Sequence, residues 1–426
     1  MSKSKKFPSS FLWGASTAAH QVEGDNHNQW TVWELENASR LAKEAGGKNN
    51  PVSIAKTELS IWPEVKDMAT DPENYISGRG VDHYNLYKQD FKLLKGLNLN
   101  ALRFSIEWSR IEPENGKWDQ NEIDHYHDYI DELIKQGIEP VLNIWHWTMP
   151  LWFCEVGEFS KRSNIKYFER FVDKIIEEYG SKVRYIITIN EANTYVMMSY
   201  IMGMWPPMKK NVFSAIFVYY NLTLAHKKAY KLIKSKNPNL QVGLAHQGAV
   251  NRPVHKFNPI EMIIAWGSDY FWYGWFYSRC RKYQDFVGSN FYQSNYIDGF
   301  KISNPSKPVS DIGWYLEPEA IEYIITKLYK KYKKPVLITE NGVADIKDEF
   351  RQWWINETIT GMQNAMDNGV EMLGYLHWSL LDNFEWAEGW WLKFGLIEVD
   401  RKNDMKRTVR PSAKWFANKI DEVSEI

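Results

Sequence analysis

Two glutamates, Glu191 and Glu340, follow short apolar segments with the composition of β-strands, residues 184–190 and 335–339. A carboxyl group at an inward-facing strand end is poorly solvated, so it must be paired, hydrogen-bonded or neutral. If one such group keeps its proton and the other is ionised, together they provide the proton donor and the nucleophile or base that cleave a glycosidic bond. The pattern fits two buried carboxylates in structural ion pairs equally well, and the residues alone leave both interpretations open.

The elements that must position these glutamates alternate along the whole chain. Short β-branched or aromatic runs are separated by stretches with apolar residues at helical spacing, which is typical of repeated βα units around a parallel sheet. The helical patterns cover residues 82–97, 121–136, 164–179, 212–235, 317–333 and 349–368. The predicted strands are residues 10–16, 101–105, 139–145, 184–190, 241–246, 285–290, 335–339 and 372–378. This strand number predicts a (β/α)8 TIM barrel of the α/β class, whose active site lies at the carboxyl ends of the strands.

A single catalytic domain over residues 1–426 is predicted. No Pro- or Ser-rich linker and no break in composition divides the chain, and its 426 residues can form one large barrel. The polar segment 37–80 is interrupted by glycine and proline and follows the first strand. We expect it as an inserted loop over the carboxyl-terminal face of the barrel.

Charge and cysteine content limit the partners and the compartment. The 52 Lys and Arg residues against 53 Asp and Glu residues give a net charge of −1, so neither nucleic acid nor a membrane surface is an expected partner. For Cys154 and Cys280, two unpaired thiols in a reducing compartment are favoured over a single bridge. The N-terminus lacks the apolar region of a secretory signal, and no apolar run reaches the roughly 18 residues of a membrane span. A cytoplasmic protein is therefore expected.

Aromatic residues make up 15% of the chain, with 21 Trp, 24 Tyr and 20 Phe. Several tryptophans, among them Trp147, Trp205 and Trp386, stand in loop or strand-end contexts rather than at regular core spacing. Aromatic faces beside polar side chains suit sugar rings, so the composition favours a carbohydrate ligand, with a bulky core as the alternative. The Met- and aromatic-rich stretches 194–207 and 262–277 are interpreted as core.

Nine motifs, which stand in order over nearly the whole chain, connect this sequence to a known family. They are FLWGASTAAHQVEG (11–24), DHYNLYKQD (82–90), LRFSIEWSRI (102–111), NIWHWTMP (143–150), TINEAN (188–193), DFVGSNFY (285–292), SDIGW with PE following (310–319), ITENG (338–342), and HWSLLDNFEWAEGW followed by KFGL (377–396). With these motifs the chain resembles glycoside hydrolase family 1, the β-glucosidase and β-galactosidase family of retaining (β/α)8 enzymes.

The resemblance implies roles for individual residues. Glu191 would be the general acid and base, and Glu340 would be the nucleophile that forms a covalent glycosyl-enzyme. Arg103 and Tyr292 would hold the charge and the orientation of Glu340, and Asn190 would reach the sugar 2-hydroxyl. The other sugar contacts would be Gln21, His146, Trp147, Trp378 as a stacking platform, Glu385, Trp386 and Phe394. The resemblance implies no metal and no other cofactor.

The chain departs from the family pattern at several positions. Ala192 replaces the proline that follows the acid, and Phe291 replaces the tyrosine that precedes Tyr292. Both changes leave the expected catalytic groups in place. The stretch between Gly243 and Asp285 is compact, so we expect a shortened region after the fifth strand and a more open barrel mouth.

One loop carries a clue to the sugar. Family members that act on 6-phosphosugars typically have serine at the position of Glu385 and a lysine and a tyrosine further along the loop. This chain has Glu385, Leu392 and Phe394, which offer nothing to neutralise a phosphate dianion. Unphosphorylated glucose, galactose and fucose configurations all remain open.

The expected function is that of a retaining, exo-acting β-glycosidase on the terminal β-D-glucosyl, galactosyl or fucosyl residue of short β-glycosides. The alternatives are a non-catalytic carbohydrate-binding relative and an enzyme that works mainly as a transglycosylase. A metal-dependent hydrolase is disfavoured because His125 and His127 point to different faces of a helix and no zinc-ligand motif occurs. The expected partner is a small β-glycoside or oligosaccharide, and no oligomeric state is predicted.

Overall fold

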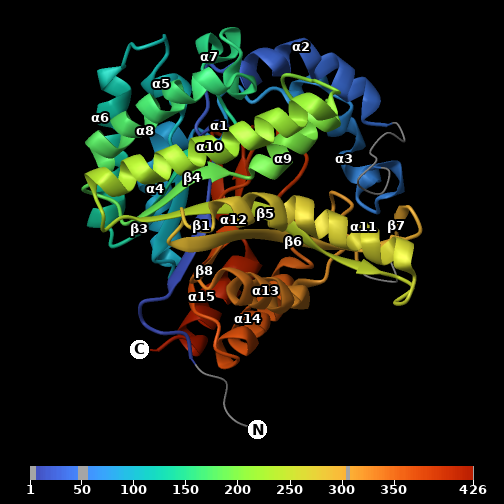
Figure 1. Ribbon diagram of the computed structural model, residues 1–426. Helices are drawn as coiled ribbons and strands as arrows, with labels where there is room; N and C mark the ends of the chain where they lie inside the picture. The colour runs from blue at the N-terminus through green and yellow to red at the C-terminus, as the bar shows by residue number, and fades with distance from the viewer. Residues whose placement is uncertain (1–5, 47–55, 304–307, 426) are drawn as a thin grey trace.

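The computed structural model describes residues 6–46, 56–303 and 308–425. Eight parallel strands form a closed barrel, because the sheet runs in the order β5-β4-β3-β2-β1-β9-β8-β6 and β5 also pairs with β6 (Figure 1). This confirms the predicted barrel, and each predicted strand corresponds to one of the eight. The barrel strands are β1 (Leu12–Ser16), β2 (Ala101–Ser105), β3 (Glu139–Trp145), β4 (Tyr185–Asn190), β5 (Gln241–Pro253), β6 (Phe286–Asp298), β8 (Val336–Asn341) and β9 (Met372–Trp378).

The register between strands brings the expected site residues to one level of the barrel. Ser16 lies opposite Arg103 on β2 and opposite Trp378 on β9. Asn290 on β6 lies opposite Glu340 on β8. Side chains from the carboxyl ends of these strands therefore meet at the same rim of the barrel, as the (β/α)8 architecture requires.

Helices cover the outside of the barrel and bury one apolar stripe each. In α8, for example, Phe168, Phe171, Val172 and Ile175 recur at helical spacing and are all buried. The six predicted helical patterns correspond to α4 (His83–Gly96), α6 (Gln120–Lys135), α8 (Ile165–Tyr179), α10 (Val212–Lys236), α13 (Ile321–Tyr332) and α14 (Arg351–Asp367). Helix α15 (Pro411–Val423), which follows the small antiparallel pair β10 (Ile397–Asp400) and β11 (Lys406–Val409), packs beside α14.

The segment after β1 is more ordered than the predicted polar loop. It contains α1 (Ala19–Val22), α2 (Gln29–Glu44) and α3 (Trp62–Ala69), with single 3-10 turns between and after them, whereas residues 47–55 lie outside the described part. Asn28 starts α2, because its side chain accepts hydrogen bonds from the backbone N–H groups of Trp30 and Thr31. The helical spacing in α2 was missed because its apolar residues are interspersed with charged ones.

The bounds of β5 and β6 differ most from the predicted strands. Strands β5 and β6 extend past residues 246 and 290, where their apolar runs were expected to end, and stay paired as far as Pro253 and Ile297. Strand β7 (Lys301–Ser303) adds to β6 in antiparallel orientation. Between β5 and β6 the chain forms α11 (Pro259–Asp269), a π-helical turn (Tyr270–Gly274) and α12 (Trp275–Cys280).

Two further sequence expectations can be compared with the structure. Cys154 and Cys280 are both free thiols, as expected. In the described part of the chain, no helix combines the length and the apolar character needed to cross a bilayer.

Candidate active site

The carboxyl ends of β4 and β8 bring the two glutamates to the barrel rim. Glu340 is the fifth residue of β8, and Glu191 directly follows β4, where it forms the N-cap of α9 (Ala192–Val196). The backbone of Glu191 has a φ of 40°, and its N–H donates to the carbonyl oxygen of Ala245 at 2.7 Å. Both side chains line the same cavity, which has a volume of about 250 Å³.

Glu340 lies between a cation and a hydroxyl donor. One carboxylate oxygen pairs with Nη1 of Arg103, and the other accepts a hydrogen bond of 2.7 Å from the hydroxyl group of Tyr292. Burial, followed by the charge of Glu340, raises the pKa of the Tyr292 phenol well above its usual range, so this phenol stays a donor. These are the contacts that a carboxylate nucleophile requires.

Glu191 occupies a different environment. Its carboxyl oxygen Oε1 accepts a hydrogen bond of 2.6 Å from the amide Nδ2 of Asn290. Burial, and then the neighbouring charge of Glu340, raises the pKa of Glu191 to about 8. Glu191 therefore keeps its proton at neutral pH, which is the state that a general acid needs.

Two asparagines connect these environments. Asn190 Oδ1 accepts from Arg103 Nη2 at 2.7 Å and from Asn290 Nδ2 at 3.2 Å. The hydroxyl group of Thr339 donates to Asn290 Oδ1 at 2.5 Å, which fixes the amide so that Nδ2 points to Glu191. Asn290 was not predicted as a site residue, although its place at the end of the DFVGSN run is the signal that could have identified it.

His146 is buried and neutral in this network. Burial, followed by the charge of Arg103, lowers its pKa well below the ordinary value. Its Nε2 lies 3.1 Å from Nδ2 of Asn190, an amide donor, so Nε2 accepts and the ring proton sits on Nδ1. The amide of Asn143 lies 3.2 Å from Nδ1, and its oxygen has no other partner among the described residues, so turning this amide over satisfies both groups.

The predicted sugar contacts divide into cavity-lining residues and residues behind them. Gln21 is fully buried and donates to the carbonyl oxygen of Phe384 at 2.8 Å and to Glu385 Oε2 at 3.4 Å. Arg103 and Asn190 also lie behind the cavity wall. Arg103 pairs with Glu340, and Asn190 contacts His146, and both of these partners line the cavity. The predicted residues that line the cavity are His146, Trp147, Glu191, Tyr292, Glu340, Trp378, Glu385, Trp386 and Phe394.

Aromatic rings form much of the inner wall. Trp147 packs against Trp386, with ring centroids 4.9 Å apart, and the ring of Trp378 is nearly parallel to that of His146 at 6.0 Å. Gly342 permits the close approach of this wall, because a Cβ atom there would lie 1.9 Å from the carbonyl oxygen of Trp378. Burial, and then the charge of Glu340, raises the pKa of Glu385 to about 8.

Large apolar side chains also line the cavity. They include Met197, Met198, Met204 and Trp272. The sequence interpretation placed the stretches 194–207 and 262–277 in the core, and the structure assigns part of each to the cavity wall instead. Periodicity could not distinguish these positions, because a residue that faces an apolar cavity has the same pattern as one that faces a packed core.

One group in the described part of the chain has the residue types of a cation site. His255, Glu261 and Asp298 bring ligand atoms within 4.8 Å of one another. None of the three lines the cavity that holds Glu191 and Glu340. The carboxylate of Glu261 already accepts from the N–H of His255 at 2.8 Å and from that of Gly299 at 3.1 Å, so it acts as a loop anchor.

Comparison with known proteins gives a consistent result. The family model described as "Glycosyl hydrolase family 1" matches residues 55–282 and 261–424. "Beta-glucosidase A" of Thermotoga maritima is 30% identical over 464 aligned positions that cover 98% of each chain, and "Beta-glucosidase A" of Acetivibrio thermocellus is 28% identical over 97% of this chain and 98% of its own.

Solved structures show the same relationship. A "beta-glycosidase from Pyrococcus horikoshii" superposes with a TM-score of 0.83 at 30% identity and covers 97% of this chain and 95% of its own. A structure of the Thermotoga maritima β-glucosidase in complex with glucoimidazole has a TM-score of 0.83 at 27% identity, and the match covers 99% of this chain and 100% of the solved one.

Proposed function

Because this chain belongs to glycosyl hydrolase family 1 and is a β-glycosidase, we propose that it removes the terminal non-reducing residue of short β-glycosides with retention of configuration. The observation that supports this most directly is the contrast between the two glutamates of one cavity. Glu340 contacts a cation and a phenol donor, whereas the pKa of Glu191 is raised to about 8 by burial and by the charge of Glu340. One group is thus prepared to attack and the other to give a proton.

In the first step, the carboxylate of Glu340 attacks the anomeric carbon while Glu191 donates its proton to the glycosidic oxygen. The bond from the anomeric carbon to that oxygen breaks, the aglycone leaves as an alcohol, and the sugar is held as an ester of Glu340. Arg103 and Tyr292 hold the nucleophile in position. Asn190, which Arg103 also contacts, would bind the 2-hydroxyl.

The second step uses the same groups in reverse. When Glu340 becomes an ester its negative charge disappears, and with it one cause of the raised pKa of Glu191. Glu191, now ionised, takes a proton from water while the water oxygen attacks the anomeric carbon and releases Glu340. Two inversions give net retention, and amino-acid side chains and water supply all the groups that react.

We assign the sugar pocket to Glu385 and the aromatic wall, with Gln21 holding Glu385 from behind and Trp378 as the platform below the ring. Glu385 would bind the 4- and 6-hydroxyls, and neither it nor Leu392 and Phe394 offers a positive charge for a 6-phosphate, so unphosphorylated glucosides, galactosides and fucosides are the proposed substrates. His146, Trp147, Trp386 and Phe394 complete this pocket.

The proposal extends to organisation and location. We take residues 1–426 as one catalytic domain, since the main core cluster includes residues from Phe7 at one end to Val423 at the other. The free thiols Cys154 and Cys280 favour a reducing compartment, in agreement with a cytoplasmic enzyme.

The test is hydrolysis of aryl β-glucoside, β-galactoside and β-fucoside, with the first-released anomer identified by NMR. The wild type should release the β-anomer, and Glu340→Gln should lose several orders of magnitude in kcat/KM. Glu191→Gln should lose about 10²–10⁴-fold, and less with a dinitrophenyl leaving group that needs no proton. Adding an alcohol acceptor to the same assay measures the share of transglycosylation.

A matched control is Glu158→Gln. Glu158 is also buried, but it accepts hydrogen bonds from Tyr195 and Tyr200 and does not line the cavity, so its loss should leave the mechanism intact. Release of the α-anomer first would contradict the retaining mechanism. A folded wild type that binds glucose but turns over none of the substrates would favour a non-catalytic carbohydrate-binding protein.

A further inference from the structure

Helix α11 is turned the opposite way from a normal surface helix. Its buried residues are Glu261, only 1% exposed, and Ala265, whereas its large apolar side chains face outward. Trp266 is 69% exposed and Ile263 is 67% exposed, and Ile260 and Met262 are also exposed. A helix that buries its carboxylate and exposes its apolar side chains has an outer face suited to a partner other than water.

The first half of α10 presents a second apolar face. Ala215, Val218 and Tyr219 pack inward, yet Phe213 and Phe217 on the outer side are 77% and 65% exposed. The helix is therefore apolar around its circumference over this half, a pattern that normally belongs to a helix buried on all sides.

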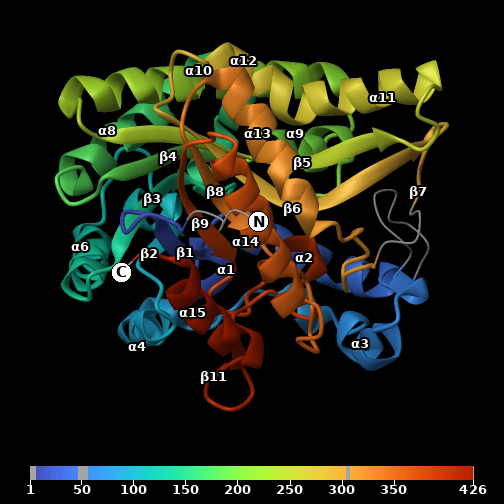
Figure 2. The same cartoon turned by 90° about the horizontal axis from the view of Figure 1, so that it is seen from below.

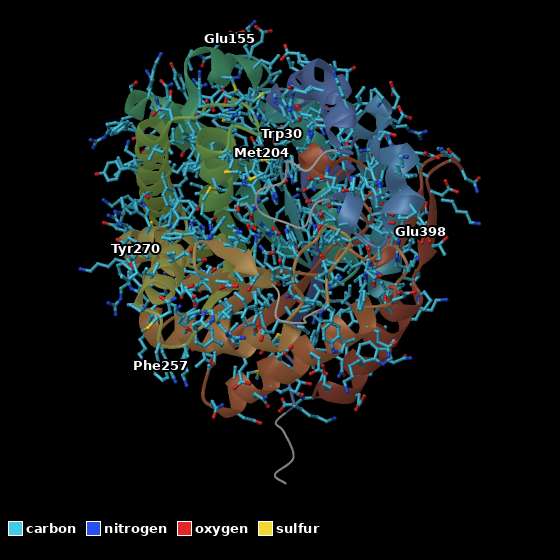
Figure 3. The ribbon with its side chains drawn as sticks, turned by 90° about the vertical axis from the view of Figure 1, so that its right-hand side faces the viewer. Trp30, Glu155, Met204, Phe257, Tyr270 and Glu398 are labelled. Atoms are coloured by element: carbon cyan, nitrogen blue, oxygen red, sulfur yellow. The ribbon has the colours of Figure 1, made fainter. Side chains whose placement is uncertain are left out.

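These two helices lie on the same side of the molecule. Figure 1 shows α10 and α11 both at the front of the molecule, and Figure 2 shows them along one edge with α12 between them. Tyr219 of α10 stacks on Trp275, the first residue of α12, with centroids 5.9 Å apart. Figure 3 places Tyr270 and Phe257 at this edge as well. We call this surface the α10–α11 face, defined by Phe213, Ile216, Phe217, Tyr220, Ile263 and Trp266.

Charge is segregated toward the α10–α11 face. From residue 192 to residue 260 the sequence contains lysine and arginine but no aspartate or glutamate, although the whole chain has a net charge of −1. Lys209 and Lys210 precede α10 and Lys256 precedes α11, and all three are exposed. The next two acidic residues are Glu261, which pairs with His255, and Asp269, which pairs with Lys327.

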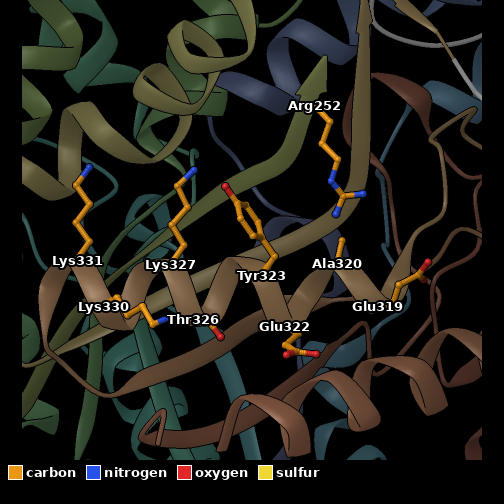
Figure 4. A pocket seen from close by; sticks show the side chains of 9 residues that line it. All are labelled: Arg252, Glu319, Ala320, Glu322, Tyr323, Thr326, Lys327, Lys330 and Lys331. Atoms are coloured by element: carbon orange, nitrogen blue, oxygen red, sulfur yellow. The ribbon is translucent and has the colours of Figure 1, made fainter. Parts of the chain in front are cut away.

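A hollow of mixed charge adjoins this face. It has a volume of about 700 Å³ and is lined by Arg252, Lys327, Lys330 and Lys331, with Glu319 and Glu322 also in its wall. Arg252 pairs with Glu317 and Lys327 pairs with Asp269. Figure 4 shows Tyr323, Lys327 and Lys331 extending from one side of α13, and Arg252 of β5 pointing toward that side. A smaller cleft shares Lys327 and Lys331 with the hollow and reaches Tyr270 and, on the α10–α11 face, Trp266.

We propose that the α10–α11 face docks on the surface of an anionic lipid bilayer. The exposed aromatic and aliphatic side chains would enter the headgroup boundary with both helices lying along the membrane plane, and the surrounding lysines would contact anionic headgroups. A second copy of this chain is a poorer occupant, because a two-fold contact would bring this basic region against itself.

The position of the active site agrees with this orientation. Ser268 and Trp272, at the end of α11 and just after it, line the cavity that contains Glu191 and Glu340, and Ile297 of β6 lines it too. The cavity wall and the α10–α11 face thus share one helix. Docking would hold the active site beside the lipid surface while leaving the sugar pocket, which is formed by other elements, unchanged.

The test measures sedimentation of the full chain with vesicles of phosphatidylcholine alone or mixed with phosphatidylglycerol, at low and at high salt. The wild type should bind the mixed vesicles at least about tenfold more strongly than vesicles of phosphatidylcholine alone, and high salt should weaken this binding. The combined variant Phe213→Ser, Phe217→Ser and Trp266→Ser should bind both vesicle types at least about tenfold more weakly than the wild type does.

A charge variant and a control separate the contributions. Lys209→Gln, Lys210→Gln and Lys256→Gln together should weaken binding to the mixed vesicles and reduce its salt dependence. The control combines Leu35→Ser and Ile134→Ser, two exposed apolar residues away from this face, and should bind as the wild type does. Aryl glucoside hydrolysis in lipid-free buffer should be the same in all variants, which shows that each is folded.

Any of three results would overturn the proposal. The first is a wild type that does not sediment with either vesicle. The second is a serine variant that sediments as well as the wild type. The third is a wild type that is a dimer by analytical ultracentrifugation and a serine variant that is a monomer, which would identify a second copy as the occupant. Loss of activity in Glu340→Gln leaves vesicle binding unaffected, so the two proposals fail independently.

Discussion

Asn290 provides a sensitive test of the site, because it contacts the proposed acid but does not itself titrate. Its amide donates to Glu191 Oε1 at 2.6 Å, and this hydrogen bond stabilises the ionised form of Glu191 and lowers its pKa. Asn290→Leu removes the donor and keeps a side chain of similar size. The pKa of Glu191, about 8 in the wild type, should therefore rise.

The expected size follows from the strength of the contact. A hydrogen bond to a charged group contributes about 1.5–3 kcal/mol, and one pKa unit corresponds to about 1.4 kcal/mol. Asn290 is fully buried and Glu191 is almost fully buried, so solvent screens the contact little. The basic limb of the kcat/KM profile, which reports the acid of the free enzyme, should move up by about one to two pH units.

The assay follows glucose release from a β-glucoside with a poor alcohol leaving group, in a series of buffers from acid to alkaline pH. Asn295→Leu is the matched control, because Asn295 lines the same cavity but donates to Asn251 rather than to a catalytic carboxyl group. Its basic limb should coincide with that of the wild type. A limb in Asn290→Leu that stays in place or moves to lower pH would refute the assignment of Glu191 as the titrating acid.

Two further predictions concern arginines. Arg103→Lys should lower kcat/KM by about 10²–10³-fold, because one ammonium group cannot replace the guanidinium that contacts both Glu340 and Asn190. Steady-state kinetics on a variant with a native circular dichroism spectrum measures this loss. An unchanged kcat/KM would contradict the prediction. Arg407→Gln should lower the free energy of unfolding by about 3–5 kcal/mol at pH 7 in urea, because buried Asp90 loses its two hydrogen bonds to the guanidinium. The control Arg40→Gln, which breaks the exposed ion pair with Glu44, should lower it by about 0.5 kcal/mol or less. Burial raises the pKa of Asp90, but its hydrogen bonds to His83 and Arg407 outweigh this and lower it, so the difference between Arg407→Gln and wild type should shrink as the pH falls below the unfolded carboxyl pKa of about 3.9.

The strands and the position of the two glutamates at strand ends could be predicted from the sequence for a physical reason. A strand that is covered on both faces needs a short apolar run, and eight such runs separated by helical patterns have few alternative arrangements. Glu191 and Glu340 were conspicuous because they end runs that are otherwise apolar. The lengths of β5 and β6 were underestimated, since their outer halves contain polar residues such as Asn251 and Asn295 that pair with each other across the two strands.

Averages over the sequence concealed the charge pattern. The near-zero net charge argued against an anionic surface as a partner, yet the acid-free stretch from 192 to 260 was present in the same sequence. The net charge is a total over all residues and does not show where in the chain the charges lie. Only the fold shows that α10, within this stretch, and α11, which follows it, lie on one side of the molecule.

The sequence by itself determined the barrel and the residue types of the site, because strand and helix periodicities and the placement of carboxyl groups are local properties. The tertiary structure decided which environment each glutamate has. Asn290 and Glu340 are distant from Glu191 in sequence, and they determine its protonation only because β4, β6 and β8 end at the same rim. It also decided that α11 buries Glu261 and exposes Trp266, since the pattern of one helix cannot state which of its faces meets the rest of the protein.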